Sequence, residues 1–198
     1  MNKRHKAIKL IWLVAPLVSL ACGLYIVLNA SAPLLPAAVF TESTNSTANK
    51  LVSTSPQIGE NRLYIPQINI NVAIVTGDNL QVLEKGAWHR HPENGNPSDG
   101  GNFVLSAHRF TMGWTPQQTR QKSPFYNIDK LNSGDKIYVD WNGQRYEYEV
   151  THRYSVDRTA IQIENRTSEA KMTLYSCDLR GEKAGREVIE ATIVNKTF

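Results

Sequence analysis

Cys177 is the residue of this sequence with the clearest capacity for covalent chemistry, because it is the only cysteine outside the first thirty residues. It ends the apolar run "KMTLYSC", which predicts that the thiol lies at the end of a strand. A thiolate is a strong nucleophile, and a nearby protonated histidine or arginine lowers the pKa of a thiol. A lone cysteine fits a buried, inert thiol equally well, so its neighbours decide between the two interpretations.

His108 is the histidine that best fits an acid–base partner, because it ends a second apolar, strand-like run in "FVLSAHR". The nucleophile and the base need only meet in space, so two strand ends that lie side by side can form a catalytic edge. Of the other histidines, His89 and His91 precede a turn-rich loop, and His152 lies inside a predicted hairpin. The "HRH" segment could bind a metal instead, or it could support the loop that follows it.

Arg180 and Arg186 follow the cysteine and are the candidates for a third catalytic group. Acyl transfer passes through an oxyanion, which a positioned cation or N–H donor stabilises. If the last predicted strand pairs beside the strand of Cys177, Arg186 lies at its start and faces the same end as the thiol. Arg180 belongs to the intervening loop and remains the alternative cation. Asp140 and Asp157 are candidates for orienting the histidine.

Short β-strands joined by turns are the elements expected to position these residues. The strongest signal is the alternation of apolar and polar residues on both sides of Asn142-Gly143, which is typical of a type I′ hairpin. A short helix capped by Asp78 is expected within residues 78–91, and one helical turn around residues 125–128. Many short strands and few helices indicate a closed or partly closed β-barrel. The other expected strands cover residues 62–75 with a break at Pro66, 103–108, 171–177 and 187–196.

The bulk composition is that of one ordinary globular domain. Hydrophobic residues make up 41% of the 198 residues and charged residues 20%. The formal net charge of +4 owes much to Lys3, Arg4, Lys6 and Lys9, so it says little about the folded part. No long Lys/Arg run lies near aromatic residues, so nucleic acid is not an expected partner. The sequence also lacks Gly-x-Ser-x-Gly, His-Glu-x-x-His and paired Cys-x-x-Cys motifs, which disfavours serine hydrolases, zincins and zinc modules.

Residues 10–28, "LIWLVAPLVSLACGLYIVL", form an uncharged apolar run that, as a helix, nearly spans a bilayer core of roughly 30 Å. The basic residues before it favour a cytoplasmic N-terminus and an extracellular C-terminal bulk. Alternatives are a signal peptide cleaved after Ala32 and a lipoprotein site at Cys22. We expect a single-pass protein of the cell membrane with a cytoplasmic basic tail (1–9), a transmembrane signal anchor (10–30), a flexible stalk (31–61) and one folded domain (62–198).

Several segments of this domain resemble the sortase family, the membrane-anchored cysteine transpeptidases of the bacterial cell surface. The resemblance runs from about Leu63 to Val194 and depends on the order and spacing of the segments together. "TLYSC" is similar to the family's Thr-Leu-x-Thr-Cys, with Ser176 in place of the second threonine. Arg186 stands about nine residues past the cysteine, where several sortase branches place their arginine. The other matching segments are "LYIPQININVAIVTG", "LEKGAWHRHPENGNPSDGGNFVLSAHR" and "SPFYNIDKLNSGDKIYV".

The resemblance implies a mainly β fold, an eight-stranded β-barrel with short helices, behind the transmembrane helix. Cys177 would be the nucleophile, His108 the acid–base residue and Arg186 the cation that holds the substrate and the oxyanion. Ser176 and Arg180 would lie against the substrate. The folded domain would then be a sortase catalytic domain, and no metal or other cofactor is expected.

The implied reaction is cleavage of a C-terminal sorting signal, similar to Leu-Pro-x-Thr-Gly, after its threonine. The enzyme would hold the product as a thioacyl intermediate and pass it to an amine. The implied partners are surface proteins that carry such a signal, and an acceptor amine on a peptidoglycan precursor or a pilin lysine. Calcium, which some sortases bind, is an alternative ligand for the acidic residues within 157–169.

Two departures from the family pattern leave the sorting motif and the subclass open. "CDLRG" lacks the proline often found two residues after the cysteine, and Arg180 is an additional cation near the site. Two other classes of protein stay as alternatives. An L,D-transpeptidase also uses a cysteine and a histidine, but the glycine that its motif places before the cysteine is missing. A non-enzymatic surface-binding module would not need the thiol, so alkylation of Cys177 would leave its binding intact.

Overall fold

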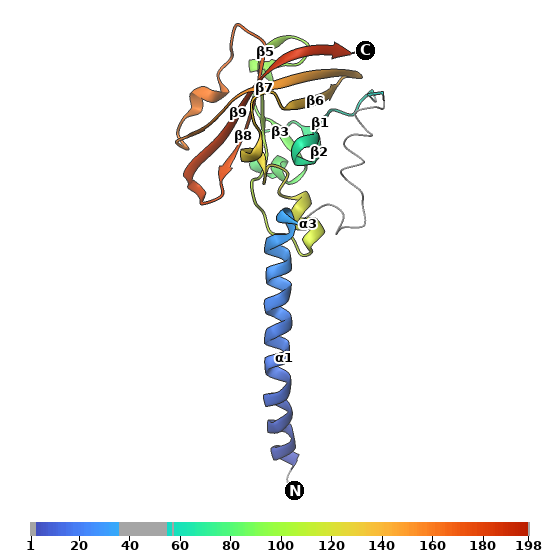
Figure 1. The fold of residues 1–198 in the computed structure, drawn as a ribbon, viewed down its shortest axis with the longest axis vertical. Coiled ribbons are helices and arrows are strands. Elements are labelled where there is room, and N and C mark those ends of the chain that lie inside the picture. Colours follow the sequence, from blue (N-terminus) through green and yellow to red (C-terminus); the bar gives the residue numbers. More distant parts are fainter. Residues whose placement is uncertain (1–2, 36–54, 57, 198) are drawn as a thin grey trace.

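A long N-terminal helix carries a β-barrel at its C-terminal end (Figure 1). This computed structural model describes residues 3–35, 55–56 and 58–197. Helix α1 (Lys3–Ser31) is continuous through Pro16, and within the described chain residues Val14–Leu34 are long and apolar enough to cross a membrane. The predicted stalk lies mostly outside the described residues; inside its bounds, η1 (Ala32–Leu34) is a short 3₁₀ helix.

Nine strands form one sheet in the order β3-β2-β1-β6-β7-β9-β8-β5-β4. An additional pairing between β3 and β5 closes eight of them into a barrel, and the two-residue β4 pairs outside this ring. The predicted eight-stranded barrel is therefore confirmed. The strands are β1 (Arg62–Ile65), β2 (Ile70–Val75), β3 (Ala87–His89), β4 (Gly95–Asn96), β5 (Gly100–Ser106), β6 (Lys136–Trp141), β7 (Gln144–Val156), β8 (Lys171–Asp178) and β9 (Gly181–Thr197).

Alternation along the strands separates the interior of the barrel from its outer face. In β8, Met172 and Leu174 belong to the main apolar core, whereas Tyr175 belongs to a second, smaller cluster. The same division holds in β5, where Phe103 and Leu105 are in the main core. Because side chains alternate between the two faces of a strand, every second residue of β5 and β8 points out of the barrel.

Short helices connect the strands. They are η3 (Pro66–Ile68), η4 (Leu80–Glu84), η5 (Pro92–Asn94), α3 (Pro116–Gln121), η6 (Ile128–Lys130) and η7 (Ile161–Glu164). The helix expected within residues 78–91 is only the 3₁₀ helix η4. Its cap is Asn79 rather than Asp78, and residues 87–89 form strand β3 because they pair with β2 and β5. Helix α3 was not expected, although Thr115 caps it through the amide of Gln118.

The predicted hairpin between β6 and β7 is confirmed. Asn142 and Gly143 both have positive φ angles, 51° and 80°, as a type I′ turn requires. Next to the turn, Arg145 and Asp140 are cross-strand neighbours and form a buried ion pair, with Nε 2.6 Å from Oδ1. We call this the far end of the barrel, and it is also where β9 ends, because Arg145 pairs with Thr197.

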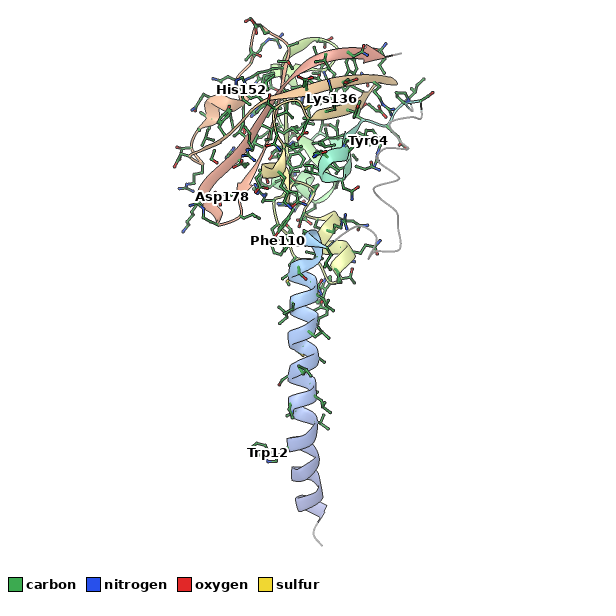
Figure 2. All side chains as sticks on the ribbon, viewed as in Figure 1. Trp12, Tyr64, Phe110, Lys136, His152 and Asp178 are labelled. Atoms are coloured by element: carbon green, nitrogen blue, oxygen red, sulfur yellow. The ribbon has the colours of Figure 1, made fainter. Side chains whose placement is uncertain are left out.

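Strand direction brings three chain segments to the opposite end, which we call the catalytic end. Strands β5 and β8 are parallel, and β9 runs antiparallel to β8. The last residues of β5 and β8 therefore lie beside the N-terminal part of β9. In Figure 2, Asp178 at the end of β8 lies nearer to α1 along the long axis than His152 or Lys136. The catalytic end is thus the end that faces α1.

Candidate active site

The outer face of three neighbouring strands carries the predicted catalytic residues. Cys177 and Arg186 are direct cross-strand partners in the β8–β9 ladder. The last registered pair between β5 and β8 is Ser106 with Tyr175, and His108 and Cys177 each follow two residues later. Facing residues of paired strands point to the same side, with Cβ atoms about 4.5–5.5 Å apart. Cys177 and Arg186 are therefore neighbours on the outer face, and the backbone of His108 lies just beyond the adjacent end of β5.

A buried hydrogen bond fastens the ends of the histidine and cysteine strands to each other. The hydroxyl of Ser176 donates to the carbonyl oxygen of Ala107 at 2.8 Å, and Ser176 is only 1% exposed. Beyond β5, the amide of Phe125 donates to the carbonyl oxygen of His108 at 3.1 Å. Ser176 points into the barrel, so its hydroxyl positions backbone in this structure. Its predicted contact with the substrate stays a prediction.

Gly185 allows β9 to pass close to β7 just before Arg186 faces Cys177. Its φ angle is +121°, and an added Cβ would lie 2.5 Å from the carbonyl oxygen of Val156 on β7. A side chain at this position would therefore both strain the backbone and collide with β7. The close approach holds Arg186 opposite Val156 on one side and opposite Cys177 on the other.

Arg186 contacts a buried carboxylate that the sequence did not single out. Its Nη1 lies 3.3 Å from Oε1 of Glu164 in η7, and its guanidinium carbon lies 4.9 Å from the centre of the Tyr175 ring. Glu164 is 5% exposed, and the hydroxyl of Tyr175 donates to the same Oε1. Burial, together with this hydrogen bond to a carboxylate, raises the pKa of Tyr175.

Residues before β4 complete the surroundings of Glu164. Nη1 of Arg90 lies 3.4 Å from its Oε1 and donates to the hydroxyl of Tyr175 at 3.0 Å. Nε2 of His91 donates to its Oε2 at 2.9 Å. Three basic side chains thus surround one buried carboxylate. This carboxylate connects the β7–β8 segment to the segment after β3 and to Arg186.

His108 faces Glu84 of η4 rather than either aspartate that the sequence suggested. Nε2 of His108 lies 3.3 Å from Oε1 of Glu84, and Lys122 binds the other carboxylate oxygen at 2.8 Å. The hydrogen bond from Lys122 lowers the pKa of Glu84, and His108 adds to this effect. Asp140 is paired with Arg145 at the far end and Asp157 binds Thr159, so neither orients His108.

Comparison with known proteins agrees with this arrangement. The sortase domain family matches residues 63–194. This chain belongs to the sortase family. It is 29% identical to sortase A of Listeria monocytogenes over 127 residues, which cover 64% of this chain and 52% of that protein. It is 30% identical to sortase D of Bacillus subtilis over 123 residues, covering 61% and 55% respectively.

The barrel also matches a solved sortase structure. The crystal structure of Listeria monocytogenes sortase A covers 69% of this chain with a TM-score of 0.59 and 25% identity, and 88% of that structure is matched. The chain spans about half the length of the curated relatives named above. Membership of the family identifies the domain as a sortase domain and not as an L,D-transpeptidase domain.

The second arginine of this sortase has different surroundings from Arg186. The side chain of Arg180 is 77% exposed and binds Asp178 through two parallel contacts, Nε to Oδ1 at 3.0 Å and Nη2 to Oδ2 at 2.8 Å. Hydrogen bonds from Arg180 lower the pKa of Asp178 to about 2. Arg180 lies in the turn between β8 and β9, and its predicted role in substrate binding stays a prediction.

The "HRH" segment does not gather its two imidazoles around one point. His89 is buried between Phe103 and Trp141, and its Nε2 donates to the carbonyl oxygen of Gly95 at 2.9 Å. Burial lowers the pKa of His89. The ring of His91 lies between two carboxylates instead, with Nδ1 3.1 Å from Glu93. Among the described residues, no three His, Cys, Asp or Glu side chains converge as metal ligands.

A cavity of about 720 Å³ lies away from the three predicted catalytic residues. It is lined from η1, the β1–β2 segment, α3 and the loop after α3, and it contains Arg62, Lys85 and Arg120. Neither His108, Cys177 nor Arg186 lines it. We therefore do not place the acyl chemistry there.

Sequence inspection missed Glu84 and Glu164 for different reasons. Glu84 ends a short 3₁₀ helix more than twenty residues before His108, and nothing in its neighbours marks it as a partner. Glu164 lies in a polar connection, and its only signal is the apolar pair Ile161 and Ile163 just before it. One of these, Ile163, packs on the outer face with Val104 and Val188. This packing places the next residue, Glu164, beside Tyr175.

Proposed function

We propose that this sortase is a membrane-anchored cysteine transpeptidase that cleaves a C-terminal sorting signal and transfers the new carboxyl end to an amine. The observation that carries the proposal is the direct pairing of Cys177 with Arg186, with the strand end of His108 on the other side of the cysteine. A nucleophile, an acid–base group and a cation on one edge are the three parts that acyl transfer needs.

The first half of the reaction forms a thioester. The thiolate of Cys177 attacks the carbonyl carbon of the threonine in a signal similar to Leu-Pro-x-Thr-Gly, and the carbonyl electrons move onto its oxygen. The guanidinium of Arg186 stabilises this oxyanion. When the oxyanion collapses, the carbon–nitrogen bond breaks, and the protonated imidazole of His108 gives its proton to the leaving amine.

The second half transfers the acyl group. An acceptor amine attacks the thioester carbon and loses a proton to His108, and the carbon–sulfur bond breaks to return the Cys177 thiolate. The new amide joins the surface protein to the acceptor. A peptidoglycan precursor and a pilin lysine both present an amine of this kind, and we propose one of these as the acceptor.

The contact between Arg186 and Glu164 defines the starting state for substrate binding. At 3.3 Å the ion pair is longer than a strong charge-assisted hydrogen bond, which measures about 2.7–2.9 Å. Glu164 has three other donors, Arg90, His91 and Tyr175. The guanidinium can therefore turn toward a substrate carbonyl without leaving a buried carboxylate unpaired.

We propose that α1 is the anchor and that the domain lies outside the cell. The apolar run is preceded by Lys3, Arg4, Lys6 and Lys9, and basic residues are retained on the cytoplasmic side. In this arrangement the substrate and the enzyme are both attached to the outer surface of the membrane. The division into a tail (1–9), an anchor (10–30), a stalk (31–61) and a catalytic domain (62–198) is part of this proposal.

Trapping the intermediate tests the proposed reaction. The full chain in detergent micelles is incubated with a library of sorting-signal peptides, without and with an amine such as triglycine. We expect mass spectrometry to find an acyl adduct on Cys177 without amine and a ligated peptide with amine. Cys177→Ala should abolish both products, and Cys22→Ala is the matched cysteine control and should abolish neither.

Three results would contradict the proposal in different ways. Cleavage that persists in Cys177→Ala would show another nucleophile. An adduct that only water resolves, even at high amine concentration, would make the protein a hydrolase and not a transpeptidase. Absence of any adduct across the library, from a chain whose thermal unfolding shows that it is folded, would reject the whole reaction.

A further inference from the structure

The loop that follows His108 exposes three apolar side chains in alternation. Phe110, Met112 and Trp114 are 42%, 47% and 85% exposed, while Arg109 between β5 and the loop is buried. Exposed and half-buried residues alternate along this loop from Phe110 to Trp114. Single exposed apolar residues are normal, but a contiguous row of them marks a surface with a partner. We call Phe110, Met112 and Trp114 the loop face.

This loop is attached to helix α1. The hydroxyl of Tyr25 donates to the carbonyl oxygen of Trp114 at 2.7 Å, and the hydroxyl of Thr119 in α3 donates to Asn29 at 3.3 Å. Nη1 of Arg120 donates to the carbonyl oxygen of Leu35 at 3.3 Å. Asn29 is fully buried in this contact. The contacts fix the height of the loop face along the helix.

The same height can be measured from the cytoplasmic side of the helix. Lys9 is the last charged residue before the apolar run. At about 1.5 Å per residue, a hydrocarbon core of roughly 30 Å that starts at Leu10 ends near Ala30. Tyr25 then lies about 7 Å inside that boundary, and its ring can extend toward the surface. The carbonyl oxygen of Trp114, which accepts the hydrogen bond from the Tyr25 hydroxyl, is thereby placed at the level of the outer interface.

We propose that the loop face docks on the lipid surface, with Trp114, Met112 and Phe110 in the outer interfacial layer beside α1. Tryptophan and tyrosine are enriched in this layer, where their rings lie among the headgroups. Lipid is favoured over a protein partner because the loop face continues the lipid-facing surface of α1 at the same level. The inference rests on α1 crossing the membrane, as proposed above, but not on the transpeptidation.

Docking would fix the position of the active site relative to the bilayer. Only Arg109 separates His108 from Phe110, and Phe110 packs its ring against Tyr126 with centroids 6.1 Å apart. In Figure 2, Phe110 lies where the domain meets α1, while Trp12 lies far down the helix. The catalytic edge is then held just above the headgroups, so substrates that emerge from the membrane reach it without the domain tilting.

Tryptophan quenching in vesicles tests the proposal on the full chain. The protein is reconstituted in phosphatidylcholine vesicles whose lipids carry bromine either near the headgroup or near the end of the acyl chain. In a Trp12→Phe background, the signal of Trp114 is the difference between chains without and with Trp114→Phe. We expect this difference signal to be blue-shifted relative to tryptophan in water and to be quenched most by bromine near the headgroup.

Two other tryptophans supply the controls. The difference produced by Trp12→Phe alone reports whether α1 is inserted in the bilayer. Trp141, next to the far-end turn, is the matched tryptophan of the domain, and the difference produced by Trp141→Phe should be insensitive to bromine. Quenching of Trp12 without quenching of Trp114 overturns the docking proposal and leaves the anchor intact. Absence of quenching at both tryptophans overturns the docking proposal and the membrane anchor. A protein partner for the loop face would then replace lipid as the proposal.

Discussion

The two ends of the barrel handle charge in opposite ways. At the far end, Asp140 and Arg145 form one closed, two-point ion pair, 3% and 7% exposed, beside a tight two-residue turn. At the catalytic end, Glu164 is as deeply buried but is shared among several donors, and the side chains of His108 and Arg186 are 30% and 21% exposed. At the far end one carboxylate meets one guanidinium at two points, and at the catalytic end one carboxylate is shared among four donors.

This difference distinguishes the residues that stabilise the fold from the residues that we propose take part in the reaction. The far-end pair is buried and stabilises the folded state, and removing one member leaves a buried charge. Groups with more than one partner can change contacts during a reaction at a small cost. Changes at the far end should therefore lower stability and spare the activity of each folded molecule, while changes at the catalytic end should do the reverse.

The largest expected effect is that of Asp140→Ala. It leaves Arg145 buried without its carboxylate, which costs about 3–5 kcal/mol of unfolding free energy. Urea unfolding measures this loss, and transfer activity per folded molecule should stay within about twofold of the unmodified chain. The double variant Asp140→Leu/Arg145→Met removes both charges and should recover much of the loss. If Asp140→Ala instead lowered activity at unchanged stability, the far end would belong to the active site.

Arg186→Ala is the converse change. It removes the proposed oxyanion cation, so kcat/KM for peptide transfer should fall about 10²–10³-fold, or about 2.7–4 kcal/mol. Glu164 keeps three donors, so the urea midpoint should move little. Arg180→Ala is the matched arginine change and should lower kcat/KM much less, because the Arg180 side chain is 77% exposed and bound to Asp178. The opposite result for the two arginines would assign the cation to Arg180.

A smaller effect is expected for Ser176→Ala. It removes the buried hydrogen bond to the carbonyl of Ala107, a change worth about 1–3 kcal/mol. We expect kcat to fall about tenfold, which is about 1.4 kcal/mol, with little change in KM, since the hydroxyl points into the barrel. Ser176→Thr keeps a hydroxyl and should restore kcat. A rise in KM at constant kcat would instead support the sequence-based prediction that Ser176 contacts the substrate.

The smallest expected effect concerns acid stability and His89. Burial lowers its pKa in the folded chain, so the unfolded chain binds more protons between the folded value and about 6.5. Its contribution to stability is therefore complete above pH of about 6.5 and decreases as the pH falls toward the folded pKa. His89→Gln should reduce the loss of melting temperature between neutral and mildly acidic pH. The exposed His152→Gln is the control, and equal slopes in both variants would contradict this assignment.

Local patterns in the sequence were sufficient for the hairpin at Asn142-Gly143 and for the strand that carries Cys177, whereas the strand predicted to end at His108 ends at Ser106. The pairing of Arg186 with Cys177 could also be anticipated, because a short connection between consecutive strands produces an antiparallel pair. These features depend on residues near one another in the chain, where periodicity and turn chemistry act directly.

Features that depend on distant pairing were not accessible in this way. The closing contact of β3 with β5 turned an expected helix end into a strand, since two neighbouring strands offered hydrogen bonds to residues 87–89. Glu84 and Glu164 reach the site only through the folded barrel. Helix α3 could have been predicted from local residues, because Thr115 followed by Pro116 is a helix start signal. The polar composition of the helix led us to expect a loop there.

The β8–β9 turn also indicates where the chain of this sortase can be lengthened or shortened. After Cys177 and Arg186, the next paired residues are Asp178 and Gly181. Residues 182–185 of β9 therefore have no paired residue in β8. Insertions or deletions at 182–184 would alter the tip of the hairpin without moving the sulfur relative to the guanidinium. As long as Gly185 remains against Val156, evolution or a designer can lengthen this tip toward new acceptors while the reactive pair stays in register.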